Sequence, residues 1–300
     1  MSSHLIAVLE ALFVAFLWAT SWVFIKIGLQ TIAPLTFAGL RYILAFACLL
    51  FVLLFSKSKK EVKELPGRVW VRLIVLGLLF YAGTQGTQFI ALAYLPAVTV
   101  NLLWSFSTVT VALLAIVWLS EKPTFFQWGG ILLAILGAVL YFYPVAIPKT
   151  QIVGVIVALA GIIVHAMSLI LGRDINRSGE HHPLVVTVIS MGAGSIVLLV
   201  TGLCAEGIPE INLKGWIIIV WLALVNTALA FTLMNRTLRT LTAMESSMIN
   251  STILIWIPIF AVVFLGESIT VKEIIGLVLT SMGTVIVQLR HLPRVQKVTT

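Results

Sequence analysis

The chain has 300 residues, of which 60% are hydrophobic and 10% are charged, and its mean hydropathy is +1.12. A soluble protein of this size could not bury so much apolar surface, so a lipid bilayer must cover part of it. The formal net charge of +8 does not indicate nucleic-acid binding, because the basic residues cluster in short loops between apolar runs, as in membrane proteins.

A membrane-spanning helix needs about 20 mostly apolar residues. Ten runs in the sequence meet this requirement, so we predict an all-α integral membrane protein with ten transmembrane helices. The runs are 5–28, 33–55, 70–92, 97–118, 125–144, 151–171, 183–204, 215–235, 243–264 and 271–289. No cleavable signal peptide is expected, because the first run is too long and continues into a polar-faced helix.

Lysine and arginine are distributed unequally between the two sets of loops. One set carries Lys57, Lys59, Lys60, Lys63, Arg68, Lys122, Arg173, Arg177, Arg236, Arg239, Arg290, Arg294 and Lys297. The other set holds little beyond Lys149, Lys214 and Lys272. Because cytoplasmic loops are enriched in basic residues, we expect both termini in the cytoplasm and the chain in the inner (cell) membrane.

One stretch of the sequence occurs twice. Residues 119–140 align without a gap with residues 265–286, at a constant offset of 146 positions. The paired residues include Glu121 with Glu267, Thr124 with Thr270, Gly130 with Gly276, and Gly137 with Gly283. We therefore predict two repeats, 1–145 and 151–290, followed by a cytoplasmic tail, 291–300. Five helices is an odd number, so the second repeat enters the membrane from the opposite side and the repeats are inverted.

Several ordered segments resemble those of a known family. They are FLWATSWVFIKIGL (16–29), PLTFAGLRYILAF (34–46), ALAYLPAVTVNLL (91–103) and the two helices that follow Glu121 and Glu267. The chain thereby resembles the EamA group of the drug/metabolite transporter superfamily. This resemblance implies an inner-membrane exporter of amino acids or related metabolites. It also implies a central cavity built from the first, third, fourth, sixth, eighth and ninth helices.

Polar side chains recur on the predicted central helices, where a bilayer makes them costly unless they face a partner or a wet cavity. We predict that they line a substrate cavity; the alternative is interhelical hydrogen bonding worth about 0.6 kcal/mol each. The candidate residues are Ser21, Gln85, Gln88, Asn101, Ser105, Asn226, Ser247, Asn250 and Ser251.

Four tryptophans fall away from the membrane interface, where tryptophan is usually found. Trp18, Trp22, Trp104 and Trp256 are therefore candidate cavity residues, and they favour a substrate with an apolar or aromatic part. Ordinary packing or lipid contact is the alternative.

Charged and special residues suggest further roles. Arg41 is interpreted as structural rather than substrate-binding, and Lys26 and Arg173 are expected to extend their charges towards the interface. Glu121 and Glu267 are each expected to cap the helix that follows them.

Two residues within the apolar runs bear on coupling and movement. His165 is the mid-helix group that titrates in a useful pH range, so it is a candidate for the substrate site. His165 and Glu245 are both candidates for proton coupling. The alternative for His165 is a neutral packing role. Pro258 is a candidate hinge.

The sequence favours an exporter of small metabolites that works by alternating access. The alternative is a multidrug efflux pump driven by proton antiport. An enzyme is disfavoured, because no paired midplane acids, metal-spaced cluster or nucleophile–base pair is evident. The expected partners are a small-molecule substrate and the lipid bilayer, without nucleic acid or cofactor, and the chain is expected to act as a monomer.

Overall fold

The computed structural model describes residues 3–119, 124–144, 148–177, 180–237, 240–241 and 243–288, and every regular element in these ranges is a helix. The first half holds α1 (Ser3–Gly28), α2 (Pro34–Phe55), α3 (Lys59–Glu64), α4 (Gly67–Gly77), η1 (Leu78–Thr84), α5 (Gln85–Tyr94), α6 (Ala97–Leu119) and α7 (Phe125–Phe142). The second half holds α8 (Lys149–Arg177), α9 (Pro183–Glu206), α10 (Leu213–Ala223), η2 (Leu224–Leu229), α11 (Ala230–Thr237), α12 (Ala243–Ser251), α13 (Ile253–Leu265) and α14 (Val271–Gln288).

Within these described ranges, nine helices are long and apolar enough to cross a membrane. The tenth predicted run is also helical, as α14, although it is not among the nine. The short helix α3 lies in a linker that the sequence pattern left without structure. The chain is therefore an all-helical integral membrane protein.

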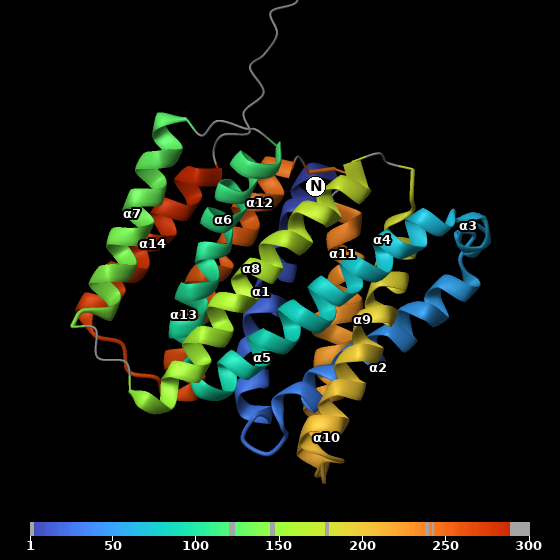
Figure 1. Ribbon diagram of the computed structural model, residues 1–300, viewed down its shortest axis with the longest axis horizontal. Coiled ribbons are helices and arrows are strands. Elements are labelled where there is room, and N and C mark those ends of the chain that lie inside the picture. Colours follow the sequence, from blue (N-terminus) through green and yellow to red (C-terminus); the bar gives the residue numbers. More distant parts are fainter. Residues whose placement is uncertain are drawn as a thin grey trace, which may run out of the picture.

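The outer edges of the bundle are helix pairs (Figure 1). At one edge α7 packs along α14, and elsewhere α2 packs along α9. Gly130 meets Gly283, and Gly137 meets Gly276, so α7 and α14 run antiparallel. A Cβ atom on any of these four glycines would come within 2.5–2.8 Å of the partner helix. These glycines therefore allow the two helices to approach closely.

The third and eighth predicted helices each contain a π-helical segment, η1 and η2. These segments begin at Leu78 and Leu224, which differ by the same 146 positions as the sequence repeat. In each segment a threonine hydroxyl donates to the carbonyl five residues earlier: Thr84 to Leu79 (2.9 Å) and Thr227 to Leu222 (2.8 Å). Such segments occur mostly at functional places in helices.

The ninth predicted helix is broken at Thr252, between α12 and α13, whereas Pro258 lies inside α13. Proline has no N–H, so Pro258 leaves the Leu254 carbonyl without its usual helical donor. The Asn101 side-chain amide of α6 donates to this carbonyl over 3.3 Å. The carbonyl freed by the proline is thus satisfied from a neighbouring helix.

The hydrophobic core is divided unequally. The main buried cluster includes the contacts of α8 with α5 and α6, through residues such as Leu95, Ala97, Ala158 and Ile162. The contacts of α1 with α11 and α12 belong instead to two small clusters, centred on Ala7, Ala11 and Leu241 and on Val14, Leu17 and Ala230. We call α8 against α5 and α6 the far seam, and α1 against α11 and α12 the near seam.

Candidate functional site

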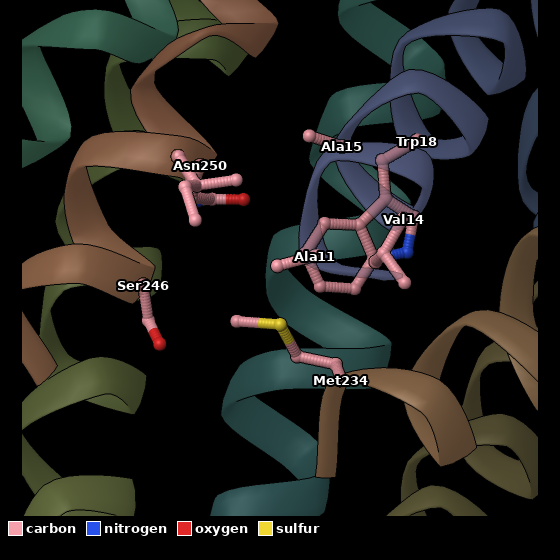
Figure 2. A pocket seen from close by; sticks show the side chains of 8 residues that line it. Ala11, Val14, Ala15, Trp18, Met234, Ser246 and Asn250 are labelled. Carbon is pink, nitrogen blue, oxygen red and sulfur yellow. The ribbon is translucent and has the colours of Figure 1, made fainter. Parts of the chain in front are cut away.

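The near seam holds a narrow cleft, with about 160 Å³ of empty space that includes space open to solvent. Its lining residues come from α1, α11 and α12: Ala11, Val14, Ala15, Trp18, Met234, Ser246, Ile249 and Asn250. On α1 the lining positions recur at helical spacing, so one face of this helix forms a wall. Figure 2 shows Asn250 and Met234 reaching into the space between α12 and α1. None of the eight lining residues is charged.

Two polar groups face this cleft. Ser246 is only 5% exposed, and its hydroxyl is buried with no hydrogen-bond partner. A buried hydroxyl without a partner is costly, so this group is suited to a bound solute or water. Asn250 is exposed within the cleft. Of the predicted site residues, Trp18 and Asn250 line the cleft; the side chain of Ser247 lies outside the described part of the chain.

Two ion pairs lie near the cleft. Glu10 of α1 faces Arg236 of α11 at 3.5 Å, and Glu245 of α12 faces His4 of α1 at 2.9 Å. Each carboxylate lies one helical turn from a lining residue, Glu10 from Val14 and Glu245 from Ile249. A mostly apolar lining therefore has carboxylates and an arginine about one helical turn away.

Polar contacts deeper in the bundle join α1 and α2 to η2. Asn226 is fully buried, and its amide donates to the Leu17 carbonyl and to the Thr20 hydroxyl, the latter at 3.1 Å. The side-chain oxygen of Asn226 is buried and has no hydrogen-bond partner. Arg41 is 4% exposed and donates from Nε to the Thr227 hydroxyl over 3.1 Å. This geometry agrees with the structural interpretation of Arg41.

The remaining predicted tryptophans do not gather around the cleft. Trp22 is buried in the main cluster. Trp256 stacks on Phe260, with a centroid separation of 5.7 Å, and also touches Phe16. Trp104 lies at the far seam, 2.9 Å from the position that a Cβ atom on Gly161 would occupy.

The remaining polar candidates are distributed over both seams. Ser21 and Gln88 are buried, Gln85 and Ser251 are half-buried, and the Ser105 hydroxyl donates to Leu102 of its own helix. His165 packs against Phe80, with ring centroids 6.0 Å apart, and its Nδ1 is buried without a partner. Apart from Trp18 and Asn250, the predicted residues therefore do not form one site in this conformation.

The side of the bundle where α1 ends is held by charged groups. The Lys26 ammonium donates to the carbonyls of Leu92 and Leu95, each at 2.6 Å. The Glu267 carboxylate accepts from the backbone N–H groups of Ala97 (2.6 Å) and Val98 (3.1 Å). Lys26 therefore points inward to protein carbonyls, contrary to the expectation that it extends outward.

Glu267 caps α6, and the prediction that it caps the following helix was wrong. The following helix, α14, has its own cap, because the Thr270 hydroxyl accepts from Glu273 N–H at 3.3 Å and Glu273 accepts from Thr270 N–H at 2.7 Å. A Thr-x-x-Glu sequence is a recognised capping signal, which could have been read from the sequence. Glu121 lies outside the described residues.

This arrangement defines a multi-pass helical membrane protein with a narrow cleft between helices from both halves of the chain. The EamA-like transporter family model matches residues 5–143 and again residues 152–289. The chain belongs to the EamA-like transporter family.

Named relatives agree with this assignment. The chain is 25% identical to the uncharacterized transporter YyaM of Bacillus subtilis (strain 168), over 84% of this chain and 83% of that protein. It is 30% identical to an S-adenosylmethionine/S-adenosylhomocysteine transporter of Chlamydia trachomatis (serovar L2), over 42% of this chain and 38% of that protein. A solved crystal structure matches with a TM-score of 0.66 at 17% identity, covering 94% of this chain and 96% of that chain.

Proposed function

We propose that the protein carries a small metabolite across the inner membrane by alternating access between two inverted five-helix repeats, 1–145 and 151–290. The two separate matches to the family model support this division. The antiparallel pairing of α7 with α14 supports a two-fold relation. The contact of Gly130 with Gly283 maps onto the contact of Gly276 with Gly137 when 146 is added or subtracted. Inverted repeats can exchange conformations, which gives two states open to opposite sides.

The observation that carries the proposal is the difference between the two seams. The near seam holds the cleft, whereas the far seam belongs to the main core. At the far seam, a Cβ atom on Gly154 would lie 2.7 Å from Tyr94. A carrier of this kind has one seam open while the other is closed. The basic residues favour a cytoplasmic position for the near side, so this state supports loading from the cytoplasm and export.

The chemistry of the cleft favours an amino acid or related zwitterion with an apolar or aromatic side chain. Glu10 and Glu245 suit an ammonium group, and Arg236 suits a carboxylate. Trp18 and Met234 offer polarizable apolar surface to a side chain. S-adenosylmethionine, named for the chlamydial relatives, also joins an amino-acid group to an aromatic base. Predicted residues on the far-seam helices, such as Gln88, Trp104 and His165, would contact the solute when that seam opens.

The alternative is multidrug efflux driven by proton antiport. The unpartnered Nδ1 of His165 favours this candidate, because an imidazole can take up and release a proton. In this case the apolar lining would accept many amphipathic compounds, and no zwitterion would be preferred.

Counterflow in proteoliposomes, with a panel of amino acids, amines and dyes, tests the proposal. We expect saturable exchange of apolar or aromatic amino acids that does not require a pH gradient. Exchange of dyes alone, dependent on a pH gradient and lost in His165→Ala, would select the efflux pump. If no solute in the panel exchanged, the carrier proposal itself would fail.

A further inference from the structure

The turn between α5 and α6 is held from two directions by opposite charges. Lys26, near the end of α1, binds the last carbonyls of α5, and Glu267, after α13, binds the first N–H groups of α6. A helix carries partial negative charge at its C-terminus and partial positive charge at its N-terminus, so both contacts are favoured. Lys26 and Glu267 therefore bind opposite ends of the same turn with opposite charges.

The turn that these contacts hold lies at the far seam. The N-terminal part of α8 packs on the same turn, because a Cβ atom on Gly154 would lie 2.7 Å from Tyr94 and 2.8 Å from Leu95. Glu267 comes from the second half of the chain, so its contact with α6 joins the halves at this point. Because the turn packs on α8 and is fixed by Lys26 and Glu267, loss of these contacts would free α5 and α6 to separate from α8.

The second repeat has no lysine at the position that corresponds to Lys26. At the offset of 146 positions Lys26 corresponds to Gly172, and the neighbouring Arg173 is exposed. Glu267 corresponds to Glu121, which lies outside the described residues. The near seam holds the cleft, with small clusters in place of the main core.

We propose that Lys26 and Glu267 form a releasable latch that keeps the far seam closed, and that its release is required for the far seam to open. This inference rests on the alternating access proposed above, and it adds the residues that control one of the two openings. Hydrogen bonds to charged groups are individually strong enough to hold a seam, yet weak enough for a bound solute to reverse their effect.

Glu206 provides a matched control on the same side of the bundle. Its carboxylate also caps a helix of the other half, since it accepts from the N–H groups of Leu35 (3.0 Å) and Thr36 (2.8 Å) at the start of α2. This cap belongs to the α2–α9 pair and has no lysine partner like Lys26. Loss of the Glu206 cap should therefore affect stability alone.

The test is thiol labelling from the far side at Thr87→Cys, in a protein whose Cys48 and Cys204 are replaced by alanine and serine. Thr87 lies on α5 against Gly161 of the far seam. A membrane-impermeant maleimide is applied to reconstituted protein, and the labelling rate is measured with thermal stability. We expect Lys26→Met and Glu267→Gln each to raise the rate about tenfold, the change expected from losing one charged hydrogen bond.

Two control variants separate loss of the latch from a general loss of stability. Glu206→Gln should lower the melting temperature without changing the labelling rate, and Lys26→Arg should keep the slow rate. If Lys26→Met does not fold, Glu267→Gln alone decides. Unchanged labelling in Glu267→Gln would overturn the latch, even if solute exchange were normal. Faster labelling without exchange of any solute would support the latch and count against the transport proposal.

Discussion

Pro258 leaves the Leu254 carbonyl without its helical donor, and Asn101 on α6 supplies a replacement. The sequence predicted both residues as functional, one in a cavity wall and one as a hinge. Their pairing could not be predicted, because it depends on which helix lies opposite Pro258. At the residue scale, this contact explains why an asparagine is tolerated on a helix in the bilayer.

Replacing Asn101 with leucine should destabilise the protein by about 1 kcal/mol, because a carbonyl in an apolar setting loses its donor. The measurement is thermal unfolding in detergent. Pro258→Ala restores the N–H group within α13, so Asn101→Leu should cost little in that background. Equal costs of Asn101→Leu with and without Pro258 would show that the carbonyl is not the reason for the asparagine.

Trp18 is the predicted tryptophan that lines the cleft. Trp18→Ala should raise the KM for the transported solute about tenfold, because burying an aromatic ring is worth roughly 1.5–3 kcal/mol. Trp256→Ala is the control, since Trp256 stacks on Phe260 away from the lining and should leave the KM unchanged. An equal rise in KM for both variants would place the binding surface outside the cleft.

Sequence reasoning found part of the site for physical reasons. A mid-helix tryptophan and an intramembrane asparagine are costly in lipid, so Trp18 and Asn250 stood out. Ser246, which lines the cleft, was passed over for its neighbour Ser247, because the sequence does not show which of two adjacent serines faces the opposite helix. Lys26 and Glu267 were recognised as charged, but their partners lie about 70 and 170 residues away along the chain.

At the element scale, the helix pair α7 and α14 follows directly from the sequence. The glycines at 130, 137, 276 and 283 remove side chains where the helices cross, and polar contacts add to the fit. Gln127 donates to the Val287 carbonyl at 3.1 Å, and Thr280 donates to the Ala134 carbonyl at 3.3 Å. Small residues permit this close packing in lipid, where no hydrophobic force joins helices.

Gly137→Val should destabilise the protein by about 1–3 kcal/mol, because the added methyl groups would overlap Thr280 and force the helices apart. Gly129→Val is the matched control, since a Cβ atom there meets nothing within 4 Å. The melting temperature in detergent distinguishes the two. Equal shifts for both variants would contradict tight α7–α14 packing.

The π segments and the break in the ninth run were not predictable from hydrophobic periodicity. An inserted residue in one helical turn does not alter an apolar stretch that is hydrophobic on every face. Only the backbone shows that the two π segments begin at equivalent positions of the repeat, Leu78 and Leu224. The helical class and the run boundaries were predictable, because lipid imposes length and composition on each spanning helix.

At the scale of the whole molecule, the account depends on two seams that open in turn. The near seam holds a cleft with small separate clusters, and the far seam belongs to the main core, at the turn that Lys26 and Glu267 bind. Stability is therefore distributed unequally between equivalent contacts. Such an imbalance is expected of one state of a two-state carrier, because the other state would reverse it.

The accessibility of a cysteine introduced at each seam tests directly whether the two seams open in turn. Ser246→Cys reports on the near seam from the side where α1 begins, and Thr87→Cys reports on the far seam from the opposite side. Labelling of both single-cysteine proteins is compared in otherwise wild-type protein and in the Lys26→Met background. The account predicts that Lys26→Met speeds labelling at Thr87→Cys and slows it at Ser246→Cys. Faster labelling at both positions, or at neither, would contradict alternating access between the two seams.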